Sequence, residues 1–465
     1  MSLGSSERPL RVAIIGAGPS GFYVADALFR SALTVHIDAF DRLPTPFGLL
    51  RGGVAPDHQQ MKTVGKYYER VAGSKPGCFQ FFGNVKIGQD LSVSELQQCY
   101  DAIVFTCGAE TDKRLGIPGE DLLGSHTATE FVGWYNGHPD YQTRQFDLSQ
   151  PSIAIIGQGN VAIDVTRILA KTPAELKDSD ITEHALKSLA QSSIKEIHLI
   201  GRRGPVQAAF TELEIKELGE LEDCDVVVNP ADVVLSEADQ AELDDPANNK
   251  ARKNYAILKG FAERPRKTGV SKTIFVRFLE SPLEIKGEGH VQHLTLEKNK
   301  LTGAAGSQKA SGTGEKTDLP CGLVFRSVGY RGVAIAGVPF DDKRGIFPNE
   351  GGRIVENGLP VPGFYVSGWI KRGPSGVLGS NKPDGTATVE ALLADVASLK
   401  PAPSPSTDTM TALLSGRNVR TVSWEDWKKI DAEEVARGQA LGKPREKFVS
   451  AEEVFAFLDR VQVGA

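Results

Sequence analysis

Three glycines near the N-terminus have the spacing of a phosphate-binding turn. Gly16, Gly18 and Gly21 follow the apolar run 10–15 and precede residues 22–30, whose apolar positions have helical spacing. The first glycine permits a tight turn, the second lets the backbone approach a pyrophosphate, and the third lets the helix pack on the strand. The helix N-terminus then directs its free N–H groups at the anion. A single fingerprint is a weak signal, because an ordinary glycine turn explains it equally well.

A carboxylate that binds the ribose of the nucleotide is expected about 20 residues after the first glycine. Asp41 ends the next predicted strand, residues 33–40, and lies about 25 residues after Gly16, so it is the first candidate. Asp38 is nearer in count, but it lies inside the strand and is the second candidate. The alternative for Asp41 is an ordinary turn residue at a strand end.

A second fingerprint, in the variant that ends in alanine, follows another apolar strand. Gly157, Gly159 and Ala162 come directly after the run 152–156, and residues 163–170 continue as a predicted helix. Two turns of this kind, each between a predicted strand and a predicted helix, are a much stronger signal than one. The sequence therefore predicts two nucleotide-binding units.

Two arginines occupy the place where a NAD-binding unit would carry an acidic residue. Arg202 and Arg203 follow the predicted strand 196–200, and their guanidinium groups can bind the 2′-phosphate of NADP through paired hydrogen bonds. They lie about 45 residues after Gly157, which is more than usual. A polar helix with Asp180 as its predicted N-cap explains the extra length. The alternative is an arginine pair at a solvated strand end.

The segment 43–58 is rich in proline and glycine, so regular structure is not expected there. A loop of this kind beside a fingerprint is expected to form one wall of the nucleotide site. His58 is its notable side chain. Taken alone, a single histidine is more often a hydrogen-bonded structural residue than a functional one.

The remaining composition excludes several classes of protein. The chain has 465 residues and a formal net charge of −6, which is not typical of a nucleic-acid-binding protein. No apolar run is long enough for a membrane span, and the polar N-terminus does not predict a secretory signal. The five cysteines include no CxxC pair, which argues against a zinc site, an iron–sulfur cluster and a redox dithiol. We therefore expect no metal and an intracellular protein.

The two fingerprints belong to a larger set of motifs, with which the chain resembles the adrenodoxin reductase family and, more narrowly, its bacterial NADPH–ferredoxin reductases. The resemblance extends over nearly the whole chain. The motifs that carry it are GAGPSG (16–21), LPTPFGL (43–49), GVAPDH (53–58), FFGNV (81–85), IPGED (117–121), GQGNVAIDVTRIL (157–169), GRRGPVQAAFTELEIKEL (201–218), RSVGY (326–330) and GWIKRGPSGVLGSNK (368–382).

The fold that this resemblance implies is α/β, with two Rossmann-like three-layer dinucleotide-binding domains. A discontinuous FAD domain would comprise residues 1–110 and 325–465, and an NADP domain of residues 111–324 would be inserted into it. A helical extension of about residues 408–465 would close the chain. We expect its helices to pack on the FAD domain rather than to form a separate module.

The resemblance also implies the cofactor contacts. FAD would lie on the first fingerprint and NADP on the second, with Gly376 beside the nicotinamide. The family position for a further cation at NADP falls on either Lys113 or Arg114. The residues implied for FAD are Gly16, Gly18, Ser20, Gly21, Asp41, Leu49, Val85, Trp369, Gly376, Val377 and Leu378. Those implied for NADP are Gln158, Gly159, Asn160, Val161, Arg202, Arg203 and Glu214, with Lys113 as the preferred cation.

Two further side chains become catalytic candidates through the resemblance, which implies that His58 and Glu214 lie near the reacting rings. A carboxylate there can orient the nicotinamide carboxamide, and an imidazole can hold that carboxylate or relay a proton. We interpret both as positioning groups. Without the resemblance, Glu214 would be assigned to a solvated helix face, because residues 212–223 are rich in charge.

The predicted function is hydride transfer from NADPH to FAD, followed by transfer of single electrons to an iron–sulfur ferredoxin that could feed a cytochrome P450. Candidates for a basic rim that docks an acidic ferredoxin are Lys216, residues 250–253 and residues 264–272. The alternatives are an NADPH oxidase or monooxygenase and a redox sensor that holds FAD and NADP without turnover. The expected location is the cytoplasm, or the mitochondrial matrix for a processed eukaryotic chain.

Overall fold

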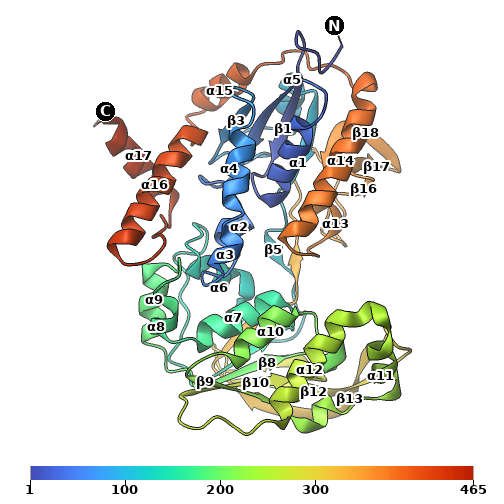
Figure 1. Cartoon of the computed structure of the whole chain (residues 1–465), viewed down its shortest axis with the longest axis vertical. Coiled ribbons are helices and arrows are strands. Elements are labelled where there is room, and N and C mark those ends of the chain that lie inside the picture. The colour runs from blue at the N-terminus through green and yellow to red at the C-terminus, as the bar shows by residue number, and fades with distance from the viewer. Residues whose placement is uncertain (1, 464–465) are drawn as a thin grey trace.

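Two sheets of largely parallel strands, one above the other in Figure 1, organise the chain. The computed structural model describes residues 2–463. We call the body around the upper sheet the first domain and the body around the lower sheet the second domain. The chain begins in the first domain, crosses to the second and returns to the first. The two crossing segments pair as an antiparallel ribbon of β5 (Thr111–Asp112) and β15 (Tyr330–Arg331).

β1 is the middle one of the five parallel strands in the first sheet, and this apolar run before the first glycine turn is buried on both faces. β1 pairs in parallel with β2 on one side and with β4 on the other. The strand order is β16-β17-β18-β4-β1-β2-β3, and β16 to β18 form an antiparallel extension. The strands are β1 (Leu10–Ile15), β2 (Val35–Phe40), β3 (Phe79–Phe82), β4 (Ala102–Phe105), β16 (Asn349–Glu350), β17 (Arg353–Glu356) and β18 (Leu359–Val366).

The second sheet is parallel throughout, in the order β6-β14-β7-β8-β10-β9. Residue 325, where the sequence placed the return to the FAD domain, lies inside β14, and β14 pairs with β6 and β7 of this second sheet. The return therefore follows β14. The strands are β6 (Ser125–Thr127), β7 (Ser152–Ile156), β8 (Glu196–Ile200), β9 (Cys224–Val228), β10 (Lys272–Arg277) and β14 (Leu323–Arg326).

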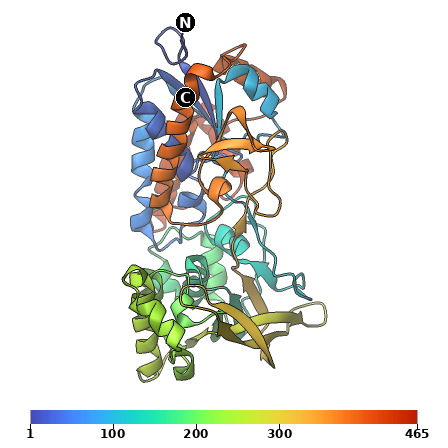
Figure 2. The same cartoon turned by 90° about the vertical axis from the view of Figure 1, so that its right-hand side faces the viewer.

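Each sheet is covered on both faces, as the expected three-layer α/β architecture requires (Figures 1 and 2). In the second domain, helices cover one face and a small antiparallel sheet covers the other, where Ile156, Ile200 and Leu294 belong to one buried cluster. That small sheet contains β11 (Glu280–Lys286), β12 (His293–Thr302) and β13 (Lys309–Pro320).

The helices follow the strands in the alternation that parallel sheets need. Their bounds are α1 (Pro19–Phe29), α2 (Leu49–Gly52), α3 (Gln59–Lys62), α4 (Gly65–Gly73), α5 (Val93–Cys99), α6 (Ala128–Tyr135), α7 (Asn160–Ala170), α8 (Pro173–Leu176), α9 (Glu183–Ala190), α10 (Glu212–Gly219), α11 (Glu237–Asp244), α12 (Asn249–Glu263), α13 (Trp369–Arg372), α14 (Asn381–Asp395), α15 (Thr407–Gly416), α16 (Trp424–Ala440) and α17 (Ala451–Val463).

The three C-terminal helices pack on the first domain, and this confirms the expectation for the end of the chain. Met410 and Leu414 of α15 lie in the core on one face of the first sheet. Trp427 and Ile430 of α16 and Leu458 of α17 join the core on the other face. None of the helices among the described residues is long and apolar enough to cross a membrane.

The segment between α16 and α17 also reaches the second domain. Lys447 of this segment and Lys62 of α3 both contact the carboxylate of Asp180, with Nζ–Oδ distances of 3.1 and 2.6 Å. The sequence predicted Asp180 as the N-cap of the following helix, and this is wrong. α9 begins at Glu183, and its N-cap is Thr182. Burial would raise the pKa of the Asp180 carboxyl, but the two ammonium groups hold it well below its usual range.

Replacing Asp180 by asparagine should lower the free energy of unfolding by about 3–5 kcal/mol, because two ammonium groups stay buried without their counter-charge. Urea unfolding measures this loss. The pKa of Asp180 is lower in the folded than in the unfolded state, so its contribution is complete above about pH 4 and is lost as the pH falls. The control is Asp459→Asn, which removes an exposed partner of Arg420 and should cost less than about 1 kcal/mol. Equal losses in the two variants would contradict the assignment.

Candidate functional site

The first glycine turn joins β1 to α1 with the geometry that its spacing predicts. Gly16 has a φ of +109°, and a Cβ there would lie 2.7 Å from the carbonyl oxygen of Thr106. A Cβ on Gly21 would lie 2.3 Å from the oxygen of Gly16, so the helix could not pack so closely on the strand. At Gly18, by contrast, the nearest atom to a Cβ would be 3.7 Å away, which leaves the backbone open to a ligand.

Asp41 lies beside this turn, whereas the carboxylate of Asp38 is bonded elsewhere. The Asp41 carboxylate accepts hydrogen bonds from the backbone N–H of Ala17, at 2.8 Å, and of Leu43, at 2.9 Å. Burial raises the pKa of Asp41 to about 6. The carboxylate of Asp38 accepts instead from the hydroxyl of Tyr100 at 2.7 Å and takes part in a buried structural network. Of the two sequence candidates, Asp41 is the one that stands next to the turn.

The loop 43–58 packs against the first turn, but it is not wholly irregular as expected, because residues 49–52 form the short helix α2. A Cβ on Gly48, whose φ is +47°, would lie 3.1 Å from the Cα of Gly18. Leu49 follows at the start of α2 and is partly exposed. Val85 is buried, and its N–H donates to the backbone oxygen of Asp41 at 2.8 Å. The candidates Leu49 and Val85 therefore lie in segments that adjoin the first turn.

The glycine-rich segment 368–382 also lies beside the first turn, at helix α1. Gly368 has a φ of +82°, and a Cβ there would lie 2.8 Å from Oγ of Ser20 in α1. The Gly368 N–H donates to Asp384 at 2.6 Å, which fixes the start of α13. Trp369 stacks on Tyr330, with ring centroids 5.3 Å apart. The candidates that follow it are Gly376, with a φ of +86°, the exposed Val377, and Leu378, which packs on the first-domain core.

The second glycine turn joins β7 to α7. A Cβ on Gly157, whose φ is +129°, would lie 2.1 Å from the oxygen of Ser327, whereas a Cβ on Gly159 would have no neighbour within 4 Å. Gln158 and Asn160 are already engaged, because Gln158 donates to the oxygen of Arg277 and Asn160 accepts from the N–H of Thr211. Val161 follows in the first turn of α7. Gly159 is therefore the point of this turn that a phosphate can approach.

Arg202 and Arg203 follow β8, next to the second turn. Their backbone is fixed, because Asn299 donates to the oxygen of Arg202 and the N–H of Leu279 donates to the oxygen of Arg203. Both side chains are exposed, and neither guanidinium has a hydrogen bond or ion pair within residues 2–463. Two uncompensated cations beside an open phosphate-binding turn are suited to a 2′-phosphate.

The structure separates the roles of Lys113 and Arg114. Arg114 pairs with Asp121 at 2.5 Å. Lys113 has its backbone tied to Gly329, and its ammonium group has no polar partner among the described residues. Lys113 is thus the cation that stays available.

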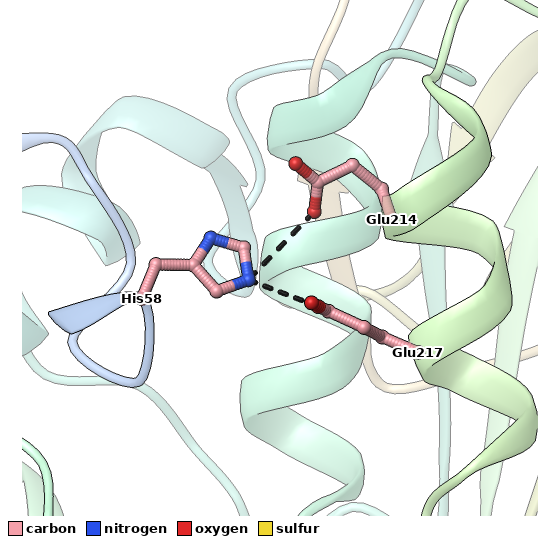
Figure 3. A group of neighbouring side chains, drawn as sticks. All are labelled: His58, Glu214 and Glu217. Atoms are coloured by element: carbon pink, nitrogen blue, oxygen red, sulfur yellow. Dashed lines mark hydrogen bonds and ion pairs between the residues drawn. The ribbon is translucent and has the colours of Figure 1, made fainter. Parts of the chain in front are cut away.

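Figure 3 shows where His58 and Glu214 meet, across the boundary of the two domains. His58 Nε2 lies 2.9 Å from Oε2 of Glu217 and 3.9 Å from Oε2 of Glu214, and both glutamates lie on α10. The predicted pair is therefore brought together, but the direct partner of the imidazole is Glu217. The sequence analysis missed Glu217, although its position one turn after Glu214 on a predicted helix was an available signal.

The two glutamates differ in their pKa values. Burial, helped by the neighbouring Asp164, raises the pKa of Glu214 to about 7. Burial also opposes ionisation of Glu217, but the hydrogen bond with His58 and the charge of Arg167 lower its pKa below the usual range. Burial would lower the pKa of His58, and the Glu217 bond raises it above its usual value. The bond between His58 and Glu217 therefore favours the ion-pair form, beside a carboxyl whose pKa lies close to neutral pH.

The donor atoms of His58, Glu214 and Glu217 lie within 4.8 Å of one another, which is a spacing that a metal ion could use. However, Nη1 of Arg167 already lies 3.3 and 3.2 Å from the same Oε2 atoms of Glu214 and Glu217. A guanidinium thus occupies the side on which a metal would neutralise the carboxylates. Arg167 and its partner Asp57 are two further residues of this cluster that the sequence analysis did not single out.

Comparison with known proteins identifies relatives that match almost the whole chain, although no family model matches it. The NADPH-ferredoxin reductase FprA of Mycobacterium tuberculosis is 44% identical over 460 residues, which are 96% of this chain and 98% of that protein. The mitochondrial NADPH:adrenodoxin oxidoreductases of Arabidopsis thaliana and Homo sapiens are 42% and 41% identical. These alignments cover 97% and 98% of this chain and 96% and 93% of the two relatives.

A solved structure agrees with the sequence relatives. The structure of Mycobacterium tuberculosis FprA in complex with NADPH matches with a TM-score of 0.90 at 44% identity. The match covers 96% of this chain and 99% of that one. Both glycine turns and the boundary between the domains thus lie within a shared architecture.

Replacing Glu217 by glutamine should lower the pKa of His58, because an ionised carboxylate that accepts from Nε2 stabilises the imidazolium. NMR titration of protein labelled with ¹³C at histidine Cε1 measures this midpoint, and the His58→Gln variant assigns the signal. The matched control is Glu220→Gln, because Glu220 lies on the surface after the same helix and pairs with Lys216. An unchanged His58 midpoint in Glu217→Gln would show that Glu217 does not hold the ring.

Proposed function

The chain belongs to the family of NADPH–ferredoxin and NADPH–adrenodoxin reductases, and we propose that it is a flavoprotein oxidoreductase that passes electrons from NADPH through FAD to an iron–sulfur ferredoxin. The observation that carries this proposal is that the chain has two glycine turns, one beside an acidic side chain and the other beside basic side chains. Asp41 adjoins the first turn, and the unpaired arginines Arg202 and Arg203 adjoin the second. His58 and Glu217 connect the two domains between them.

We propose that FAD binds to the first domain. The Asp41 carboxylate is held by two backbone N–H groups at the turn, where it can accept hydrogen bonds from the ribose hydroxyls. Gly18 and Gly48 bring bare backbone together at the N-terminus of α1, which suits a pyrophosphate. The implied flavin contacts at Trp369 and Gly376 to Leu378 are consistent with this site, because Gly368 packs on Ser20 of the same helix.

We propose that NADP binds to the second domain. Its pyrophosphate would approach Gly159 at the N-terminus of α7, where a Cβ would have no neighbour within 4 Å among residues 2–463. The 2′-phosphate would lie between Arg202 and Arg203, and Lys113 would add a further positive charge. Two guanidinium groups that have no partner within residues 2–463 can bind this phosphate without breaking an existing ion pair.

The chain's own residues orient the two reactants in the proposed reaction. NADPH supplies the hydride, and FAD accepts it and releases electrons one at a time. Glu214, with a pKa of about 7, can hydrogen-bond the nicotinamide carboxamide in either protonation state. His58 is fixed by Glu217 at the domain boundary and can hold Glu214 or exchange a proton with it. We interpret both residues as positioning groups.

The proposed electron acceptor is a ferredoxin-type protein, and a cytochrome P450 is one proposed acceptor downstream of it. Much of the basic rim suggested by the sequence is engaged within the chain. Arg264 and Arg266 both pair with the buried Asp225, and Lys272 donates to a backbone carbonyl. Lys216 stays exposed on α10, the helix that carries Glu217, and is the best-placed docking candidate. We place the reaction in a reducing compartment, the cytoplasm or the mitochondrial matrix, because all five cysteines are free thiols.

Rapid mixing of the flavin-loaded protein with NADPH tests the function. We expect loss of the oxidised flavin absorbance at about 1 s⁻¹ or faster, followed by fast reoxidation with ferredoxin and slow reoxidation with air. A flavin that NADPH does not reduce would indicate a sensor and contradict the proposal. Reoxidation by air that is as fast as reoxidation by ferredoxin would indicate an oxidase.

Replacing Arg202 and Arg203 together by glutamine should raise the dissociation constant of NADPH about 100-fold, because two charge-assisted contacts to the 2′-phosphate are lost. The dissociation constant of NADH, which lacks this phosphate, should change less than about threefold. Titration of the flavin spectrum with each nucleotide measures both constants. The control is Arg344→Gln, an exposed arginine of the first domain. An equal loss for NADPH and NADH would refute the role of the arginine pair.

A further inference from the structure

Arg167 is a charged residue in the interior of the protein that the proposed reaction does not use. Its side chain is 1% exposed and lies on α7, two turns after the second glycine turn. Burying a guanidinium is costly unless every donor finds an acceptor. The partners of Arg167 therefore indicate what this residue does.

One edge of the guanidinium holds the loop that carries His58. Nε and Nη2 of Arg167 donate to Oδ2 and Oδ1 of Asp57 at 2.8 and 3.0 Å, which is a two-pronged contact. Lys171, which directly follows the end of α7, contacts the same carboxylate at 2.8 Å. Asp57 directly precedes His58 and belongs to the first domain, whereas α7 belongs to the second. This contact therefore ties the histidine loop to the helix of the second glycine turn.

The other edge faces the carboxylates that surround the imidazole. Nη1 lies 3.3 Å from Oε2 of Glu214 and 3.2 Å from Oε2 of Glu217, and Nη2 lies 2.8 Å from Asp164. Oε2 of Glu217 is also the atom that accepts from His58. This oxygen thus lies between the guanidinium and the imidazole, and Arg167 fixes both the loop that carries the ring and the acceptor to which the ring bonds.

We propose that Arg167 is a positioning residue for the hydride-transfer site, which locks the Asp57–His58 loop of the first domain onto α7 and thereby seats His58 on Glu217. The inference rests on the proposed function, because α7 then begins at the NADP pyrophosphate and His58 adjoins the reacting rings. Helix α7 connects Gly159 to Arg167. The same helix therefore sets the position of the nucleotide and the position of His58. A lysine could supply the charge but not the fork that grips Asp57.

The charges that face His58 allow two explanations of Arg167 to be separated. Asp57, Asp164 and Glu217 raise the pKa of His58, and the positive charge of Arg167 lowers it. Glu214 Oε2 lies 3.9 Å from His58 Nε2, and the ammonium group of Lys171 contacts Asp57. If Arg167 acted only through its charge, removing it would raise the pKa of His58 further. If it positions the loop, removing it frees His58 from Glu217, and the pKa falls toward about 6.5.

The first readout is the titration midpoint of His58 in the flavin-loaded protein without NADP, measured by NMR of ¹³Cε1-histidine. We expect the midpoint to fall in Arg167→Met and in Arg167→Lys, which keeps the charge. The matched control is Arg353→Met, which breaks a two-pronged contact with Asp395 inside the first domain and should leave the midpoint unchanged. A rise in Arg167→Met, or no change in Arg167→Lys, would overturn the proposal.

The second readout is amide hydrogen exchange of the peptide that covers residues 53–60, which includes the bond from the His58 N–H to the oxygen of Ala55. We expect exchange at least about threefold faster in Arg167→Lys and Asp57→Asn than in the wild type, because local opening of the loop becomes easier. Arg353→Met should match the wild type, and unchanged exchange in both Arg167→Lys and Asp57→Asn would contradict the proposed lock. Neither readout uses NADPH, so reduction of the wild-type flavin by NADPH tests the proposed function separately from the role of Arg167.

Discussion

The compensation of buried charge at the boundary between the two domains is the constraint on which the rest of the structure depends. In the cluster around His58, Arg167 is surrounded by Asp57, Glu214 and Glu217. On another part of the boundary, Asp180 is held by Lys62 and Lys447. Each cluster draws its members from segments far apart in the chain. Since a buried charge without its partner costs several kcal/mol, these contacts favour one relative placement of the two nucleotide turns.

The local parts of the site could be predicted from sequence because their chemistry is short-range. Gly16 and Gly157 are required by positive φ angles and by backbone atoms that leave no room for a Cβ, and Gly21 is required by the close approach of the Gly16 oxygen. Asp41 and the pair Arg202 and Arg203 follow strands whose ends meet the turns, so strand order alone places them. The ends of elements were harder to predict. The sequence placed the return to the first domain inside β14, whereas the chain returns only after this strand.

The contacts between domains could not be predicted in the same way. His58 and Glu217 are 159 residues apart, and no periodicity in either segment specifies which turn of α10 faces the imidazole. The resemblance brought Glu214 into view, but the geometry gives the direct bond to Glu217. Asp180 has the composition of a helix cap and lies in a buried ion cluster instead, because Lys447 arrives from near the C-terminus. Tertiary placement decides these roles, and local propensity does not.

The difference between the two glutamates shows what this placement achieves. Glu214 and Glu217 are the same residue type on one face of one short helix, and both share Nη1 of Arg167. The closer hydrogen bond to His58 keeps Glu217 ionised, whereas burial near Asp164 leaves Glu214 with a pKa of about 7. Because the pKa of Glu214 lies close to neutral pH, this carboxyl can gain or lose a proton when an amide group binds beside it. The bond between His58 and Glu217 stays in place. Pairs of titratable groups whose environments separate their pKa values in this way are a mark of sites that handle protons.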